Sequence, residues 1–147
     1  MKISLTLIAP FLVTGAFAED LTLCVQDWQQ SQAGNHQKAL ELYAKGVETG
    51  NLSKASLART HRNMGISSKE DKQLKKAIEF YNKALALKPK DPWDDCINRG
   101  NPYDLLGGPE KALKDYGAAL KALVRKLVEE TLEQRHDPKK ALGMSLI

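Results

Sequence analysis

The sequence is poor in aromatic residues, which make up 6% of its 147 residues, and it contains only two cysteines. Strands draw on β-branched and aromatic side chains, whereas Ala, Leu and Lys recur here and favour helices. A hydrophobic content of 42% is that of an ordinary domain, and the length suits one domain. These features predict an all-α protein.

Groupings of side chains that carry catalysis or bind metals are missing. There is no glycine-rich phosphate loop and no nucleophile in a motif with a histidine. The histidines at 36, 61 and 136 are far apart and lack a partner at ligand spacing. The acidic pairs at 94–95 and 129–130 are adjacent, so they point different ways on a helix and are interpreted as caps and surface charge. We therefore expect no enzymatic activity, no metal and no cofactor.

The apolar run near the start is too short for a stable membrane span, which needs about 18 residues or more. Residues 3–13 are apolar but contain Pro10, a basic Lys2 precedes them, and residues 16–18 read Ala-Phe-Ala. This arrangement is typical of a secretory signal peptide cleaved after Ala18, with a membrane anchor as the alternative. We expect a periplasmic or secreted protein with a signal peptide at 1–18, a lead-in at 19–33 and no membrane span after cleavage.

The two cysteines, Cys24 and Cys96, leave two states open. An oxidising compartment permits a disulfide. A regular helix stack would place the two residues about two helix spacings apart, at about 8–10 Å each, whereas a disulfide needs Cα atoms within about 7 Å. A loose N-terminal segment would relax that limit. No base stands beside either thiol in the sequence, so a reactive cysteine is not expected.

The formal net charge is +4, and acidic residues are spread among the basic ones. A nucleic-acid surface would concentrate its cations in a stripe. We therefore interpret the charge as a solvated surface and expect no nucleic-acid partner.

An internal repeat organises the chain. Four residues recur 35 positions later: Gly65 at Gly100, Ala77 at Ala112, Tyr81 at Tyr116, and Ala84 at Ala119. A looser earlier copy has Ala39 and Tyr43 in the same roles. Periods of this length mark stacked helical repeats. The small residues should let two helices approach closely while the tyrosine fills the neighbouring gap.

Apolar residues within each copy follow helical spacing, with charged residues on the opposite face. Ser53 is a predicted N-cap, and Asp91 is a second, ahead of Pro92. We expect helices near 36–49, 54–67, 72–87, 92–106 and 109–135.

The pattern resembles the tetratricopeptide repeat, and in particular exported tetratricopeptide proteins of Gram-negative bacteria. The residues that carry this resemblance and should pack the repeats are Gly65, Ala77, Tyr81, Ala84, Pro89, Gly100, Tyr103, Ala112, Tyr116 and Ala119. The resemblance implies a short right-handed α-solenoid of about two and a half helix-turn-helix units, at 34–52, 53–90 and 91–122.

Some residues depart from the family pattern. Ser68 stands where an aromatic residue is usual, the turn at 69–72 lacks its glycine, and the third unit lacks its closing proline. Pro102 falls inside a predicted helix, where it should kink or shift a turn.

The last predicted helix runs on through an apolar stripe from Leu120 to Leu132. A solenoid needs its last apolar face covered, so residues 123–147 are interpreted as a capping helix and tail. The alternative is that this face docks a partner or a second copy of the chain.

The resemblance also implies that the concave face of the first helices binds ligands. The residues of this sequence at those positions are Arg59, Arg62, Asn63, Ile66, Asn98 and Asn101, with Lys69, Asp94, Ile97 and Asp104 beside them. Their amide and guanidinium groups would hold a peptide backbone or a carboxylate. The alternative is that they are solvated residues of a scaffold. The expected function is an adaptor that binds another protein or peptide, and the alternative is a self-assembling component of an envelope complex.

Overall fold

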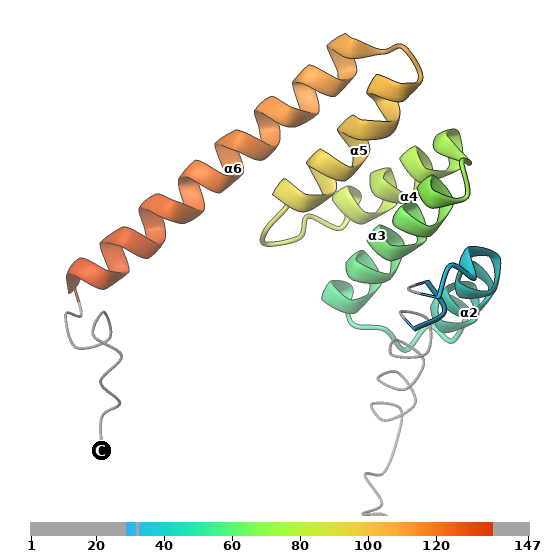
Figure 1. Ribbon diagram of the computed structural model, residues 1–147. Coiled ribbons are helices and arrows are strands. Elements are labelled where there is room, and N and C mark those ends of the chain that lie inside the picture. The colour runs from blue at the N-terminus through green and yellow to red at the C-terminus, as the bar shows by residue number, and fades with distance from the viewer. Residues whose placement is uncertain (1–28, 32, 137–147) are drawn as a thin grey trace, which may run out of the picture.

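The computed structural model describes residues 29–31 and 33–136, and those residues contain helices and turns but no strand (Figure 1). The helices are α2 (His36–Glu48), α3 (Lys54–Glu70), α4 (Leu74–Ala86), α5 (Trp93–Leu105) and α6 (Pro109–His136). The all-α prediction is confirmed, and every predicted helix is present within three residues of its expected ends. The predicted signal peptide, Cys24 and the predicted tail after 136 lie outside the described residues.

The helices stack in chain order as an α-solenoid. Helices α3 and α4 form one antiparallel hairpin and α5 and α6 form the next, while α2 packs on α3 and α4 packs on α5 (Figure 1). Helix α3 also touches α5, so the first helices of the two hairpins are neighbours. Each hairpin therefore adds one unit to the stack.

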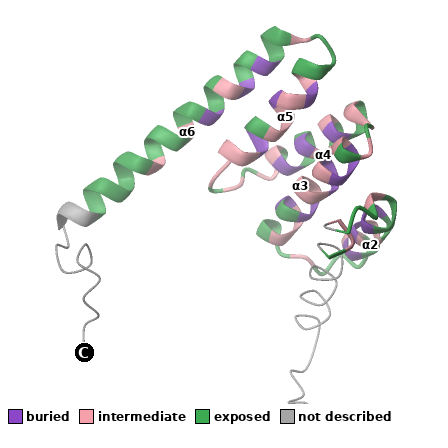
Figure 2. Cartoon of the chain, in the orientation of Figure 1, coloured by how far each residue is buried: buried purple, intermediate pink, exposed green. Residues whose placement is uncertain are grey.

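The buried residues lie where the helices cross, and they are mostly small (Figure 2). Ala77, Tyr81 and Ala84 of α4 are fully buried, and Ala112 and Ala119 of α6 are almost so. Helices α2 and α3 share an apolar cluster built from Ala39, Leu40, Tyr43 and Met64. Of the other residues expected to pack the repeats, Gly65 and Gly100 are buried, whereas Pro89, Tyr103 and Tyr116 are half-buried.

The two glycines explain how the helices of a hairpin come so close. A Cβ on Gly65 would lie 2.5 Å from Cε1 of Tyr81, and a Cβ on Gly100 would lie 2.5 Å from Cε1 of Tyr116. Real Cβ atoms do not approach an aromatic carbon so closely, because dense packing leaves no room for overlap. The 35-residue repeat of the sequence is therefore also a repeat of the same contact.

Local backbone chemistry sets the helix boundaries. The Ser53 side chain accepts a hydrogen bond from the Ser56 N–H at 3.1 Å, so the predicted N-cap is confirmed. The predicted cap at Asp91 is wrong: α5 begins at Trp93 with Pro92 as its N-cap residue and no side-chain cap. The Asp91 carboxylate instead lies 4.0 Å from the ammonium of Lys126.

The fold accommodates two residues that depart from the family pattern, Lys72 and Pro102. Lys72, in the turn that lacks a glycine, adopts a left-handed backbone conformation with φ of 60°. Such a conformation costs a side-chain-bearing residue about 1–2 kcal/mol. Pro102 does not end its helix: α5 continues through it to Leu105, and the proline is buried.

Helix α6 covers α5 with its first half and extends beyond it with its second (Figures 1 and 2). Its outer stripe is uncovered in the part of the chain that the structure describes, with exposed fractions of 68% at Leu113 and 63% at both Leu120 and Leu127. The end helix thus closes the last hairpin but leaves its own apolar face open. None of the described helices is long and apolar enough to span a membrane.

Candidate protein-binding surface

The outward faces of α3 and α5 form one continuous surface, because these two helices are in contact. On α3, Arg59 is exposed while Asn63 and Ile66 are half-buried. On α5, Asn98 and Asn101 are half-buried at the corresponding turns. The predicted ligand-binding residues therefore lie on the less buried side of both first helices, and we refer to this surface as the first-helix face.

Arg62 is not available to a ligand in the way the sequence suggested. Its Nε donates to Oδ1 of Asp95 at 2.6 Å, and its Nη2 donates to Oδ2 of the same carboxylate at 2.8 Å. Asp95 is fully buried, so its interpretation as surface charge or a cap is wrong. Because of the hydrogen bond to Asp95, the pKa of Arg62 is raised despite the opposing effect of burial. This two-pronged pair joins α3 to α5.

A second buried pair joins the two helices of the last hairpin. Arg99 donates from Nε to Asp115 at 2.7 Å and from Nη2 to the other carboxylate oxygen at 2.6 Å, and its Nη1 donates to Asn82 of α4 at 2.7 Å. The hydrogen bond to Asp115 raises the pKa of Arg99, against burial. Sequence reasoning missed both acids. For Asp115 the sequence held one signal, a spacing. Arg99 precedes Asp115 by 16 positions, the same separation as that between the packed residues Gly65 and Tyr81.

The three asparagines of the first-helix face differ in their partners. Asn101 accepts a hydrogen bond from the Tyr116 hydroxyl at 2.9 Å, so it is partly committed to the fold. The side-chain amides of Asn63 and Asn98 make no hydrogen bond within the described residues. These two amides are 35 positions apart and occupy the same place in successive units. An amide offers two donors and one acceptor, so both remain open to a ligand.

One end of the first-helix face is hollowed. A cavity of about 500 Å³ opens between the C-terminal ends of α3 and α5, and Lys69, Asn101, Asp104 and Tyr116 are among its lining residues. Lys69 pairs with the neighbouring Glu70 at 3.1 Å. Charges of both signs therefore surround the hollow, which suits a polar segment better than a strongly anionic one.

No grouping of side chains in the described part of the chain has the composition of a metal site. His61 stacks on Phe80 with ring centroids 6.4 Å apart. Burial, and then the charge of Lys83, lowers the pKa of this histidine. Cys96 is buried, and burial, followed by the nearby Asp115, raises the pKa of its thiol. A thiol with a raised pKa is a poor nucleophile, and pairing with Cys24 stays a prediction because Cys24 lies outside the described residues.

Comparison with known proteins agrees with the architecture. The family model of the tetratricopeptide repeat matches residues 58–91, which run from α3 through α4 to the turn before α5. No curated protein matches the chain. Repeats of this kind usually mediate binding between proteins. Residues 58–91 are thus a tetratricopeptide repeat, and the 35-residue register and the stacked hairpins continue the same helical architecture beyond the matched residues.

Proposed function

We propose that the protein is an adaptor, exported to the periplasm or beyond, that binds an extended segment of another protein across the first-helix face. The observation that carries the proposal is the pair of unpartnered, half-buried amides at Asn63 and Asn98. Export is supported by the signal-like composition of residues 1–18.

The spacing of the two amides suits an extended chain. Packed helices lie about 8–10 Å apart, so equivalent residues of α3 and α5 are separated by about that distance. Three residues of extended peptide span about 10 Å. Asn63 and Asn98 would thus form hydrogen bonds with backbone groups about three residues apart on the bound segment. Each successive repeat would contact the same extended chain.

The ion pair between α3 and α5 restrains the two helices that carry the amides. Arg62, the neighbour of Asn63 in the chain, is tied to the buried Asp95 of α5 and also lies 3.5 Å from Asp94. A surface that is already ordered loses less conformational entropy when it binds. Arg62 therefore supports the binding surface instead of contacting the ligand itself.

The test is recovery of partners by the full-length protein after cross-linking in its native envelope, quantified by mass spectrometry. The Asn63→Ala/Asn98→Ala variant should recover its partners several-fold less well than the unaltered protein. Asn51→Ala is the matched control, because Asn51 is an exposed asparagine in the turn between α2 and α3. Equal recovery by the double variant and the control, with equal melting temperatures, would remove the proposed surface.

A second candidate function, assembly with another copy of the chain, is favoured by the outer stripe of α6. Leu113 and Leu120 occupy the places that Ile78 and Leu85 hold one unit earlier, where α4 faces α5. Leu113, Leu120 and Leu127 lie seven positions apart, which is the spacing of a two-helix seam. Two copies of the chain that pack through the apolar faces of their α6 helices would bury these leucines in both copies.

Sedimentation at micromolar concentration tests this assembly. A dimer that dissociates in the Leu120→Lys/Leu127→Lys variant supports it. A strictly monomeric mass for the unaltered protein contradicts it, and so does a dimer that survives the substitutions. Lys121→Glu/Arg125→Glu is the control, because it changes exposed residues of the same helix and keeps the leucines.

A further inference from the structure

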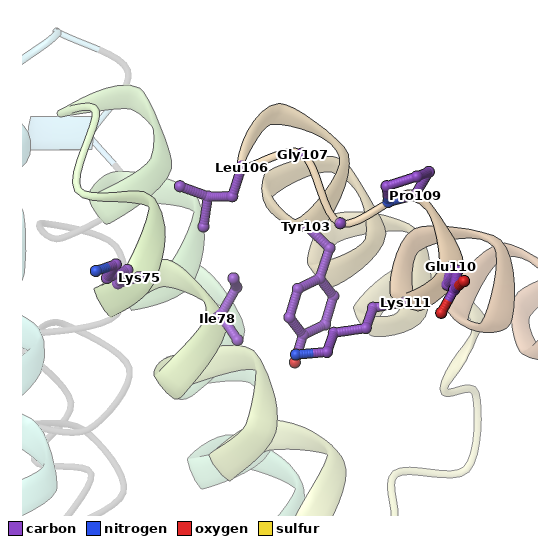
Figure 3. A pocket seen from close by; sticks show the side chains of 9 residues that line it. Lys75, Ile78, Tyr103, Leu106, Gly107, Pro109, Glu110 and Lys111 are labelled. Atoms are coloured by element: carbon purple, nitrogen blue, oxygen red, sulfur yellow. The ribbon is translucent and has the colours of Figure 1, made fainter.

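A separate hollow of about 530 Å³ lies where the turn between α5 and α6 meets α4 (Figure 3). In Figure 3 the Tyr103 ring lies between Ile78 of α4 and Lys111 of α6, with Leu106 above them. We call this the junction pocket. Its wall combines three apolar side chains, Ile78, Tyr103 and Leu106, with two cations, Lys75 and Lys111, and one carboxylate, Glu110.

Lysines outnumber acids around the junction pocket. Lys75 and Lys111 line the pocket itself, and Lys72 and Lys76 line a smaller hollow of about 360 Å³ that shares Lys75 and Leu106 with it. None of the four makes an ion pair within the described residues. Lys111 lies over the Tyr103 ring, 5.5 Å from its centroid, so its charge is held at the pocket.

The same junction one unit earlier is bridged by hydrogen bonds, beside a smaller hollow of about 370 Å³. There Gln37 at the start of α2 and Gln73 before α4 both donate to the carboxylate of Asp71. Thirty-five positions later, Leu106 stands in place of Asp71 and Gly108 in place of Gln73. The acid and the amide that bridge the first junction therefore have no counterpart at those positions in the second. The second junction has an apolar floor instead, and its two lysines make no ion pair within the described residues, although Glu110 also lines the pocket.

We propose that the junction pocket is a second binding site, specific for an acidic peptide segment that carries one large apolar side chain. The apolar side chain would cover Ile78, Tyr103 and Leu106, and carboxylates beside it would approach Lys75 and Lys111. The chemistry follows from complementarity, since an unpaired basic rim attracts anions and an exposed apolar floor gains from burial. The site is distinct from the hollow of the first-helix face, because the two hollows have no lining residue in common.

The experiment is selection of binders from a phage library of random 12-residue peptides displayed against the full-length protein. Peptides that bind the junction pocket should be enriched in Asp and Glu flanking a Leu, Phe or Trp. Synthetic copies should bind at least tenfold more weakly to the Lys75→Glu/Lys111→Glu variant. They should also bind more weakly at high salt, which screens exposed charges.

Two control variants separate the possible outcomes. Lys114→Glu/Lys121→Glu changes two exposed lysines of α6 outside the pocket, so it should alter affinity by less than twofold. Asn63→Ala/Asn98→Ala should also leave these peptides bound, which distinguishes the pocket from the first-helix face. Lys75→Gln/Lys111→Gln should lose less peptide affinity than Lys75→Glu/Lys111→Glu. It also controls for a folding defect in that charge-reversed variant.

The proposal is overturned by a selection that enriches no acidic peptide above the starting library. It is equally overturned if the acidic peptides bind the Lys75→Glu/Lys111→Glu variant as tightly as the unaltered protein. A loss that is the same in the Lys114→Glu/Lys121→Glu control would show general attraction to a basic protein and would also reject a defined pocket.

Discussion

Gly65 of α3 packs directly against the ring of Tyr81 in α4, at a distance that leaves no room for a side chain on the glycine. Tyr81 is fully buried, so its ring cannot move aside. Tyr81 also has its pKa raised, first because of burial and then because of Glu70 and Asp95. The contact fixes the crossing of the two helices, and Gly100 with Tyr116 repeats it in the next hairpin.

We therefore expect Gly65→Ala to destabilise the protein, although alanine favours helices. The helical gain of about 1 kcal/mol should be outweighed by overpacking, which costs about 1–3 kcal/mol. Urea unfolding should show a net loss of about 1 kcal/mol or more. Gly117→Ala in α6 is the control, because nothing lies within 4 Å of its Cβ position, and it should be stabilising. Similar effects at the two sites would contradict the packing argument.

Removing Arg62 should leave the buried carboxylate of Asp95 without its partner. Uncompensated buried charges cost about 3–5 kcal/mol, but the Arg62 side chain is 23% exposed and water would partly replace it. Arg62→Leu should therefore lower the free energy of unfolding by about 2 kcal/mol. The loss in Arg62→Leu/Asp95→Leu should be smaller than the sum of the two single losses. Additive losses in urea unfolding would show that the two residues do not interact.

Replacing Lys72 with glycine should stabilise the protein, although glycine usually destabilises a folded chain. Its φ of 60° disfavours any residue with a Cβ, so Lys72→Gly should raise the free energy of unfolding by about 1 kcal/mol. Lys114→Gly, inside α6, should lower it by about 1 kcal/mol because glycine is a poor helix former. Thermal unfolding of both variants gives the two signs, and a loss in both would rule out backbone strain at Lys72.

Stability should fall as the pH falls below about 6.5, in part because of His61. Its pKa is lowered in the fold, by burial and by Lys83, so the unfolded chain binds the proton more readily. The contribution of the neutral imidazole is fully present above the unfolded pKa and is lost as the pH falls through the folded pKa. The decrease between pH 8 and pH 5 should be smaller in His61→Gln. Parallel pH profiles for the two proteins would contradict this assignment.

The helices and their register could be predicted because they depend on periodic spacing along the chain. Gly65, Gly100 and their tyrosines sit in one repeating pattern, and that pattern is visible without coordinates. The role of Asp95 was not visible in the same way. Asp94 and Asp95 look alike in sequence, and only the packing of α3 against α5 shows that one is buried and the other is half-exposed.

The junction pocket escaped sequence reasoning for a related physical reason. A hollow forms where side chains are missing, as at Gly107 and Gly108, and a list of residues gives no direct measure of empty space. A comparison of the turns at Asp71 and Leu106 would have shown that the bridging acid is lost. It would not have shown that Lys75 and Lys111 make no ion pair within the described residues.

The length of α6 determines how far this helix extends beyond the stacked helices. Lys126 is the last residue of this helix with an ion pair to the stack among the described residues, and the helix continues to His136. At about 1.5 Å per residue, those ten further residues form an arm of about 15 Å. A molecule held at the tip of this arm would stand clear of both the first-helix face and the junction pocket. The arm therefore offers its exposed apolar residues, such as Leu127 and Leu132, beyond the contacts that hold the two hairpins together.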